Sequence, residues 1–160
     1  MSQRTQEQYD SLFRRLDSLC QGETDPVSLM ATIACELYHC FDGFDWVGFY
    51  RAAGNDLLKI GPYQGGHGCL TIPYSRGVCG RCAREMKLVN IPDVNSIPDH
   101  IACSGTTRSE LVLPITAGDG RLLAVLDIDS DTAAEFGAID ETNLPRLNTY
   151  FAAVTGRQAV

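Results

Sequence analysis

The sequence predicts a single α+β domain, covering residues 1–160, with a central, mostly antiparallel sheet. Helical spacing of hydrophobic residues is confined to the N-terminal quarter and the C-terminal end of the chain. The middle contains short β-branched and aromatic runs separated by turn residues, which is typical of antiparallel strands. A length of 160 residues, with 44% hydrophobic and 21% charged residues, fits one packed globular domain. Helices that flank a run of strands indicate the α+β class.

Two helices are predicted first. The first ends at Gly22 and carries an apolar stripe at helical spacing, made of Tyr9, Leu12, Phe13, Leu16, Leu19 and Cys20. The second begins at Asp25 and Pro26, a pair that suits an N-cap and the first helical position. Its apolar stripe runs from Leu29 to Phe41, and Asp42–Gly43 is expected to end it.

The middle of the chain is predicted to form strands with one inserted helix. Strands are expected at 44–50, 57–60, 69–72, 87–91, 110–116 and 121–128, and a short helix at 78–86. The polar stretch from 92 to 108 has no predicted element, and such a long loop in a small domain is usually functional. A closing helix is expected to start near Thr142 or Asn143, because Pro145 has no backbone N–H to donate.

Composition and charge exclude several classes of protein. The net charge of −7 argues against nucleic-acid binding, and no apolar run is long enough to span a membrane. Residues 1–7 contain no apolar signal core, so the chain is expected to be cytoplasmic. In that compartment most of the seven cysteines should be reduced, and a few are candidates for catalysis or metal binding.

The second predicted hairpin indicates an acidic cluster. A turn at Ala117–Gly120 would place Glu110 opposite Asp127 and Arg108 opposite Asp129, with all four side chains on one face of the sheet. Because opposed carboxylates repel each other, this face suits a bound ammonium group or an acid with a raised pKa. The alternative is a solvated sheet edge with a simple ion pair.

Trp46, Gly48 and Tyr50 share one face of the first predicted strand. Two large aromatic side chains around a glycine suit the wall of a small apolar pocket. Ordinary core packing is the alternative interpretation.

The cysteines form two groups. Those in the helical part of the chain are interpreted as structural, and they are Cys20, Cys35 and Cys40. The others lie in the loop-rich middle, and they are Cys69, Cys79, Cys82 and Cys103. His67 with Cys69, Cys79 and Cys82 would supply zinc ligands, but the His-x-Cys spacing is short and a second C-x-x-C is missing. We therefore expect no metal and no cofactor.

Six stretches of the sequence occur in the order and spacing of a known family. They are WVGFY at 46–50, GPYQG at 61–65, RGVCG at 76–80, DHIAC at 99–103, SELVLP at 109–114 and LDIDS at 126–130. With them the chain resembles the free methionine-R-sulfoxide reductases, which are single GAF domains. The resemblance implies a GAF fold whose N- and C-terminal helices pack on one face of the sheet, with a loop-built pocket on the other.

The resemblance also implies roles for individual residues. Cys103 corresponds to the nucleophile, Cys69 to the resolving thiol, and Cys79 to a third family cysteine that offers an alternative disulfide. The acids and aromatics of the family's substrate site fall on Glu110, Asp127, Asp129, Trp46 and Tyr50. Cys82 departs from the family pattern and leaves open which thiols pair. Glycines before Cys69 would let its loop move, so the oxidised protein is expected to carry a Cys69–Cys103 disulfide that closes the pocket.

The implied reaction is the reduction of free L-methionine (R)-S-oxide to L-methionine. An ordinary thiol is only slightly ionised at neutral pH, and His100, Arg108 or a helical turn near Ser104 are candidates for lowering the pKa of Cys103. Glu110 would protonate the sulfoxide oxygen, and the other acids would accept the substrate's ammonium group. A sulfenic acid on Cys103 would condense with a second thiol. A thioredoxin-like dithiol would then reduce the resulting disulfide.

The alternative function is a non-catalytic GAF module that senses a small ligand. Such a module would not depend on Cys103 or consume a dithiol, and it would usually be fused to an output domain, for which 160 residues leave no room. The expected partners are a small-molecule substrate and a thioredoxin-like reductant, without nucleic acid or membrane. Both a monomer and a homodimer are compatible with the sequence.

Overall fold

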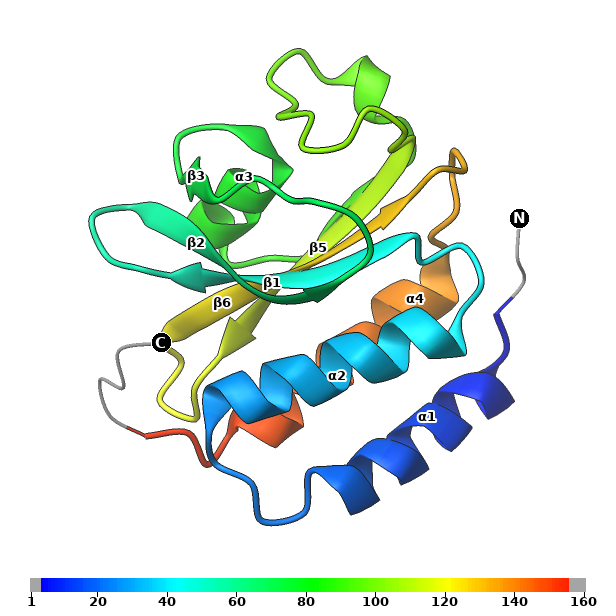
Figure 1. Cartoon of the computed structure of the whole chain (residues 1–160), viewed down its shortest axis with the longest axis vertical. Helices are drawn as coiled ribbons and strands as arrows, with labels where there is room; N and C mark the ends of the chain where they lie inside the picture. Colours follow the sequence, from blue (N-terminus) through cyan, green and yellow to red (C-terminus); the bar gives the residue numbers. More distant parts are fainter. Residues whose placement is uncertain (1–3, 156–160) are drawn as a thin grey trace.

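The computed structural model describes residues 4–155, so residues 1–3 of the N-terminal segment used above lie outside the described part. One sheet with strand order β3-β2-β1-β6-β5-β4 forms the middle layer, and each neighbouring pair is antiparallel. Figure 1 shows the long helices α1 and α2 on one side of this sheet and the short helix α3 on the other. The predicted α+β class, with helices packed on a mostly antiparallel sheet, is thereby confirmed.

The two N-terminal helices form as their capping residues predict. Helix α1 spans Gln6–Leu19 and begins with a capping box between Thr5 and Gln8. Helix α2 spans Pro26–Cys40, and the Asp25 carboxylate accepts hydrogen bonds from two backbone N–H groups of its first turn. No helix in the described part of the chain is long and apolar enough to cross a membrane.

The strands lie close to their predicted positions. They are β1 (Trp46–Ala52), β2 (Leu57–Gln64), β3 (Thr71–Pro73), β4 (Val89–Ile91), β5 (Ser109–Thr116) and β6 (Leu122–Ser130). The largest difference is at β2, which ends at Gln64, four residues beyond its predicted end. At β3 the predicted strand begins at Cys69 whereas the observed one begins at Thr71. Cys69 belongs to the preceding loop, where its side chain is free to pair with a distant segment.

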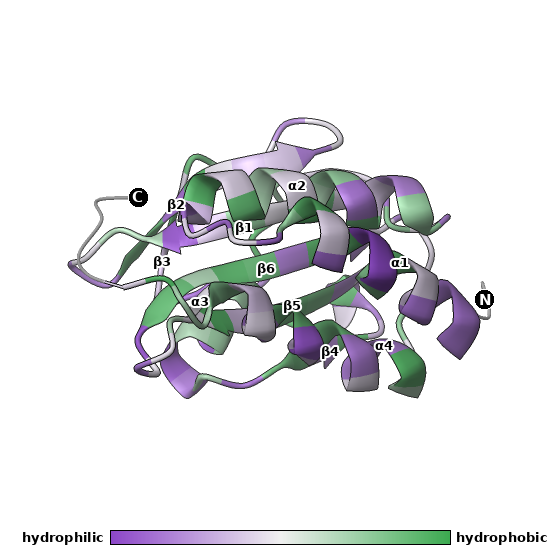
Figure 2. Cartoon of the chain, turned by 90° about the horizontal axis from the view of Figure 1, so that it is seen from below, coloured by the Kyte–Doolittle hydropathy of each residue, from purple (hydrophilic) through white to green (hydrophobic). Residues whose placement is uncertain are grey.

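Each face of the sheet carries its own hydrophobic cluster. On the α1–α2 side, alternate strand residues such as Val47, Phe49, Leu111 and Leu126 pack against the apolar stripes of the helices. On the other side, Trp46 and Tyr50 belong to a second cluster with α3. Figure 2 shows the hydrophobic colour along much of β6 and hydrophilic colour over much of α1, as expected for a buried strand and a surface helix.

The remaining helices follow the prediction to different degrees. Helix α3 (Gly77–Glu85) is at its predicted place. A 3-10 turn that was not predicted, η1 (Val94–Ser96), lies within the long polar stretch. The closing helix begins at Ala138, earlier than predicted, as α4 (Ala138–Asn143), and it continues as the 3-10 helix η2 (Leu144–Phe151). The Gly137 N–H donates to the Asp140 carboxylate, which stabilises the earlier start. Pro145 comes at the beginning of η2, where no backbone donor is needed.

Arg4 anchors the N-terminus to the segment before α4. Its guanidinium is buried, donates to Asp140 at 2.6 Å and 2.9 Å, and donates to the Glu135 carboxylate at 2.8 Å. It also lies over the ring of Phe44 at 4.7 Å. The Tyr9 hydroxyl donates to the same Asp140 at 2.6 Å. This network joins residues more than 130 positions apart in the sequence and fixes the start of α1 to the start of α4.

We expect Arg4→Met to destabilise the protein by about 3–5 kcal/mol, because it leaves two buried carboxylates without their cation. Urea unfolding of the variant measures the loss. Arg81→Met is the matched control, since the exposed Arg81–Glu85 pair should contribute little. Equal stabilities for the two variants would contradict the anchoring role of Arg4.

Candidate active site

The acidic residues lie on one face of the β5–β6 pair, but their register differs from the predicted one. Glu110 lies opposite Asp129, and Asp127 lies opposite Val112. The predicted pairing of Glu110 with Asp127 is therefore wrong, as is that of Arg108 with Asp129. The register moves by two residues, and because side chains alternate faces with period two, all three acids remain on the predicted face.

The turn and a bulge account for this shift. The turn closes with the Ala117 N–H donating to the Arg121 carbonyl, so it is one residue longer than the predicted turn. The ladder shifts again between Ile115 and Thr116, which adds the second residue. Each change alone would have paired Glu110 with a core residue, Ile128, and the two together restore the pairing of acids on one face.

Glu110 and Asp127 are buried neighbours whose surroundings favour the protonated carboxyl form. Both are about 5% exposed, and a side-chain hydrogen bond joins them. Burial and the neighbouring Asp129 raise the pKa of Glu110 well above its ordinary range, and burial together with Glu110 does the same to the pKa of Asp127. One oxygen of Asp127, Oδ1, is buried without a hydrogen-bond partner. An unpartnered buried carboxyl oxygen indicates a place where a ligand donor binds.

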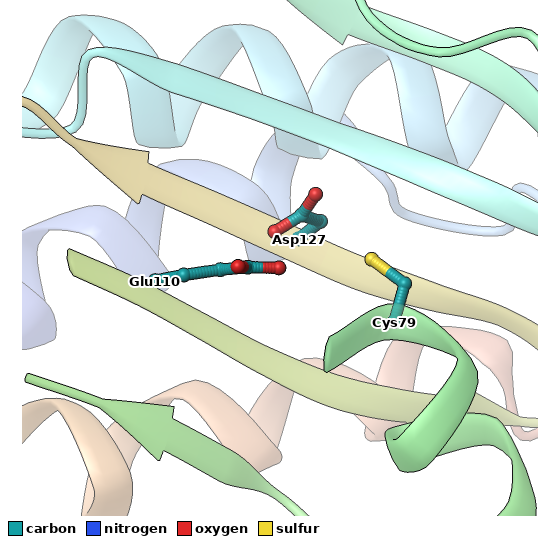
Figure 3. A group of neighbouring side chains, drawn as sticks. All are labelled: Cys79, Glu110 and Asp127. Carbon is teal, nitrogen blue, oxygen red and sulfur yellow. The ribbon is translucent and has the colours of Figure 1, made fainter. Parts of the chain in front are cut away.

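Cys79 joins these acids from the opposite element. Figure 3 shows its sulfur, on α3, pointing toward Glu110 on β5 and Asp127 on β6, and one donor atom of each residue lies within 4.8 Å of the others. Burial, and after it the charge of Asp127, raises the pKa of the Cys79 thiol well above its ordinary range. These three residues are a donor set able to hold a cation. The zinc set of His67 with Cys69, Cys79 and Cys82 is not assembled in residues 4–155, where Cys69 is in a disulfide.

His100 contacts the buried acid from the long polar loop. Its Nε2 lies 3.3 Å from Glu110 Oε2. Desolvation lowers the pKa of His100 while burial raises that of Glu110, so both shifts favour the neutral groups and weaken the ion-pair character of this contact. The lowered pKa of His100 therefore disfavours its supplying a positive charge to Cys103. Arg108 is exposed, and the chain at Ser104 bends without forming a helical turn, so neither of these predicted contributions is seen.

A disulfide joins Cys69 to Cys103, with their Cα atoms 5.2 Å apart. It is the pairing expected of the oxidised protein. The loop before Cys69 lies on the aromatic wall, where the Trp46 indole N–H donates to the Gly66 carbonyl at 3.0 Å. At Gly68, an added Cβ would come within 2.9 Å of the Tyr50 hydroxyl. The glycine thus allows close packing as well as movement.

Two cavities meet at Cys103. The inner one has a volume of about 20 Å³, room for one water molecule. Its lining includes Cys79, His100, Cys103, Glu110, Asp127 and Asp129. The outer one measures about 320 Å³ and is lined by Trp46, His67, Cys103 and Asp129 among others. Tyr50 stacks beside Trp46 with ring centroids 5.8 Å apart. In the disulfide form the inner cavity is too small for an amino acid, as expected of a closed state.

Asp45 and Asp131 were missed by sequence reasoning. Both line the outer cavity with Asp129, and the Asp45 carboxylate accepts the backbone N–H of Asp131 at 2.8 Å. The period-two series Asp127, Asp129 and Asp131 is a signal that could have identified the third acid.

The other cysteines lie away from these cavities. Cys20 is buried at the end of α1, while Cys35 and Cys40 are half-buried on α2. Cys82 is fully buried in the cluster beneath α3, and burial raises its pKa to about 12. A thiol in that setting is a packing group.

We expect Asp127→Asn to stabilise the protein by an amount that grows with pH. The unfolded chain releases this proton near pH 3.8, whereas the folded protein keeps it to a higher pH. The contribution to stability is therefore full below about pH 4 and is lost as pH rises through the raised folded pKa. Asparagine has no such proton to lose. Urea unfolding at pH 5 and pH 8 should show an advantage that is larger at pH 8 by about 1 kcal/mol.

The exposed Asp42 provides the control for this measurement, because Asp42→Asn should change stability equally at the two pH values. A gain for Asp127→Asn that is independent of pH would contradict the raised pKa.

Comparison with known proteins gives consistent matches. The GAF domain family matches residues 25–153. The chain is 42% identical over 137 residues to protein YtsP of Bacillus subtilis, covering 85% of this chain and 83% of that protein. It is 37% identical over 139 residues to the free methionine-R-sulfoxide reductase of Escherichia coli, covering 87% and 83%. The structure of free methionine-R-sulfoxide reductase from Neisseria meningitidis, in complex with its substrate, superposes with a TM-score of 0.86 at 38% identity, covering 98% and 96%.

Proposed function

The chain belongs to the free methionine-R-sulfoxide reductase family of GAF domains, and on that premise we propose that it reduces free L-methionine (R)-S-oxide to L-methionine. The observation that carries the proposal is the Cys69–Cys103 disulfide, whose Cys103 shares a cavity with three acids. A module that only binds a ligand has no need of a disulfide at the mouth of its pocket.

Cys103 is the proposed nucleophile. Its thiolate attacks the sulfoxide sulfur as the oxygen takes up a proton, the oxygen is transferred from the substrate sulfur to the Cys103 sulfur, and methionine leaves with Cys103 as a sulfenic acid. The Cys69 thiol then attacks the sulfenic sulfur, which forms the disulfide and releases water. The substrate gains two electrons, and the two cysteines lose two. The disulfide of the structure is the final state of this sequence.

Glu110 is the proposed proton donor. A departing sulfoxide oxygen must be protonated, and burial raises the pKa of Glu110, which favours the protonated form that can donate. Glu110 lines the same cavity as Cys103. The neighbouring Glu110 also raises the pKa of Asp127, so the pair favours holding a proton.

The remaining acids are proposed to recognise the free amino acid. Asp127 Oδ1 has no hydrogen-bond partner among residues 4–155, and Asp129 lines both cavities, so both can accept an ammonium group. A methionine residue within a protein has no such group, which explains a preference for the free amino acid. Trp46 and Tyr50 would pack against the apolar part of the substrate.

Cys69 rather than Cys79 is the proposed resolving thiol. Cys79 is buried on a helix, and burial raises its pKa, which disfavours the thiolate that must attack. Cys69 lies in a loop, at bonding distance from Cys103. Cys79 then serves as a pocket residue. A thioredoxin-like dithiol reduces the Cys69–Cys103 disulfide and restores both thiols.

Incubation with dithiothreitol and each epimer of free methionine sulfoxide tests this function. We expect methionine to form from the R epimer, with one dithiol consumed per methionine. The same assay with methionine sulfoxide inside a peptide should yield almost no product. If neither epimer is reduced, the enzyme assignment fails and the ligand sensor becomes the better interpretation.

A further inference from the structure

We propose that the protein reductant, a thioredoxin-like dithiol, docks along the outer edge of β3 and covers Leu70, from where it attacks the sulfur of Cys69. This inference rests on the proposed function, because only a thiol enzyme must have its disulfide reduced after each turnover. Three features of the described chain meet at this edge: an exposed hydrophobic side chain, an unpaired backbone and an open groove.

Leu70 is the residue directly after Cys69, and 73% of its surface is exposed. This is the largest exposed fraction among the large hydrophobic residues of positions 4–155. An isolated exposed leucine is common on protein surfaces. Leu70 differs because it stands next to a sulfur that another protein must reach.

The backbone beside Leu70 is free to pair with a partner. Strand β3 is the outermost strand of the sheet, next to β2. The Leu70 carbonyl accepts from Ile60, and Ile72 pairs with Leu58, so both of these residues turn their polar groups toward β2. Because the direction alternates, the N–H and carbonyl of Thr71 point outward. An open strand edge is a template for an extended segment of a partner.

A groove continues this edge beyond β3. It has a volume of about 610 Å³ and is lined by Pro73 at the end of the strand and by Tyr74 and Ser75 after it, with residues 55–57 on one side and Ala83 and Arg84 of α3 on the other. Figure 1 shows β3 and α3 lying next to each other at this side of the molecule. The Pro73 carbonyl accepts from the Arg76 N–H, which ends the open edge. Three strand residues span about 10 Å, so a partner that pairs at Thr71 beside Cys69 would have the groove within reach.

The chemistry favours attack on Cys69. Cys103 lines both cavities, which a partner's thiolate would have to enter, whereas Cys69 lines neither. When the partner's thiolate attacks Cys69, a mixed disulfide forms, the Cys69–Cys103 bond breaks, and the electron pair stays on Cys103 as the thiolate needed for the next turnover. The partner's second thiol then attacks the mixed disulfide, which frees Cys69 and leaves the partner oxidised.

Leu70→Gln tests the docking surface. With thioredoxin, its reductase and NADPH, we expect the KM for thioredoxin to rise at least about fivefold, because an interface side chain beside the reacting sulfur is lost. With dithiothreitol the rate should equal that of the wild type, since a small dithiol needs no docking surface. Leu19→Gln is the matched control, because Leu19 is also exposed, at 58%, but lies on α1.

A second variant probes the backbone. Thr71→Pro removes the outward N–H, and proline is tolerated on an edge strand when that N–H faces away from the sheet. It should also raise the KM for thioredoxin while dithiothreitol still supports turnover. The proposal is overturned if Leu70→Gln and Thr71→Pro both keep the wild-type KM, or if thioredoxin fails to support turnover that dithiothreitol supports. Loss of turnover with both dithiols in the wild type would instead refute the proposed function.

Discussion

Replacing Cys103 by serine is expected to lower the turnover of free methionine sulfoxide by at least about 1000-fold. A hydroxyl group is a much weaker nucleophile than a thiolate, and it cannot go on to form a disulfide with Cys69. The fold should survive, because Cys103 lies in a loop and the two sulfurs need not be bonded in the reduced protein. Methionine formation with dithiothreitol measures the loss, and melting of the reduced proteins checks the fold.

Two further cysteine variants make this result specific. Cys35→Ser changes a half-buried thiol on α2, away from the cavities, and should leave turnover unchanged. Cys69→Ser, with thioredoxin as the reductant, should release one methionine per chain and then stop, because no disulfide forms for thioredoxin to reduce and the sulfenic acid on Cys103 is not resolved. Near-normal turnover of Cys103→Ser would show that another thiol is the nucleophile.

Replacing Glu110 by glutamine is expected to lower turnover by about 100- to 10,000-fold, the range of a lost general acid. Glutamine keeps the shape of the side chain but has no acidic proton to give to the sulfoxide oxygen. Stability should be unchanged or slightly higher, because a carboxyl group with a pKa raised by burial and by Asp129 is removed. The activity of the wild type should fall as pH rises through that raised pKa, since the acid form is lost.

The measurements are kcat and the melting midpoint of the reduced protein. Glu85→Gln serves as the control, because Glu85 is an exposed partner of Arg81 on α3 and should affect neither quantity. A large loss of stability in Glu110→Gln with turnover retained would mean that the acid is structural rather than catalytic.

The sequence by itself determined the features that depend on nearest neighbours along the chain. Asp25 and Pro26 begin α2 because a capping side chain and a proline act within one turn. The face of each strand follows from period-two alternation, so Glu110, Asp127 and Asp129 could be placed together before their partners were known. The cysteine roles came from the resemblance to a family, not from spacing.

Only the tertiary structure decided which residues face one another across the sheet. The register of β5 on β6 depends on a longer turn and a bulge, which no hydrophobic pattern records. The sequence pattern does not predict contacts between distant segments either. Examples are the hydrogen bond from Arg4 to Asp140 and the contact of the His100 imidazole with Glu110. Such pairs depend on how the layers of the fold pack, because contact partners are decided by distance in space. A periodic sequence pattern predicts only which face of a helix or strand a side chain occupies.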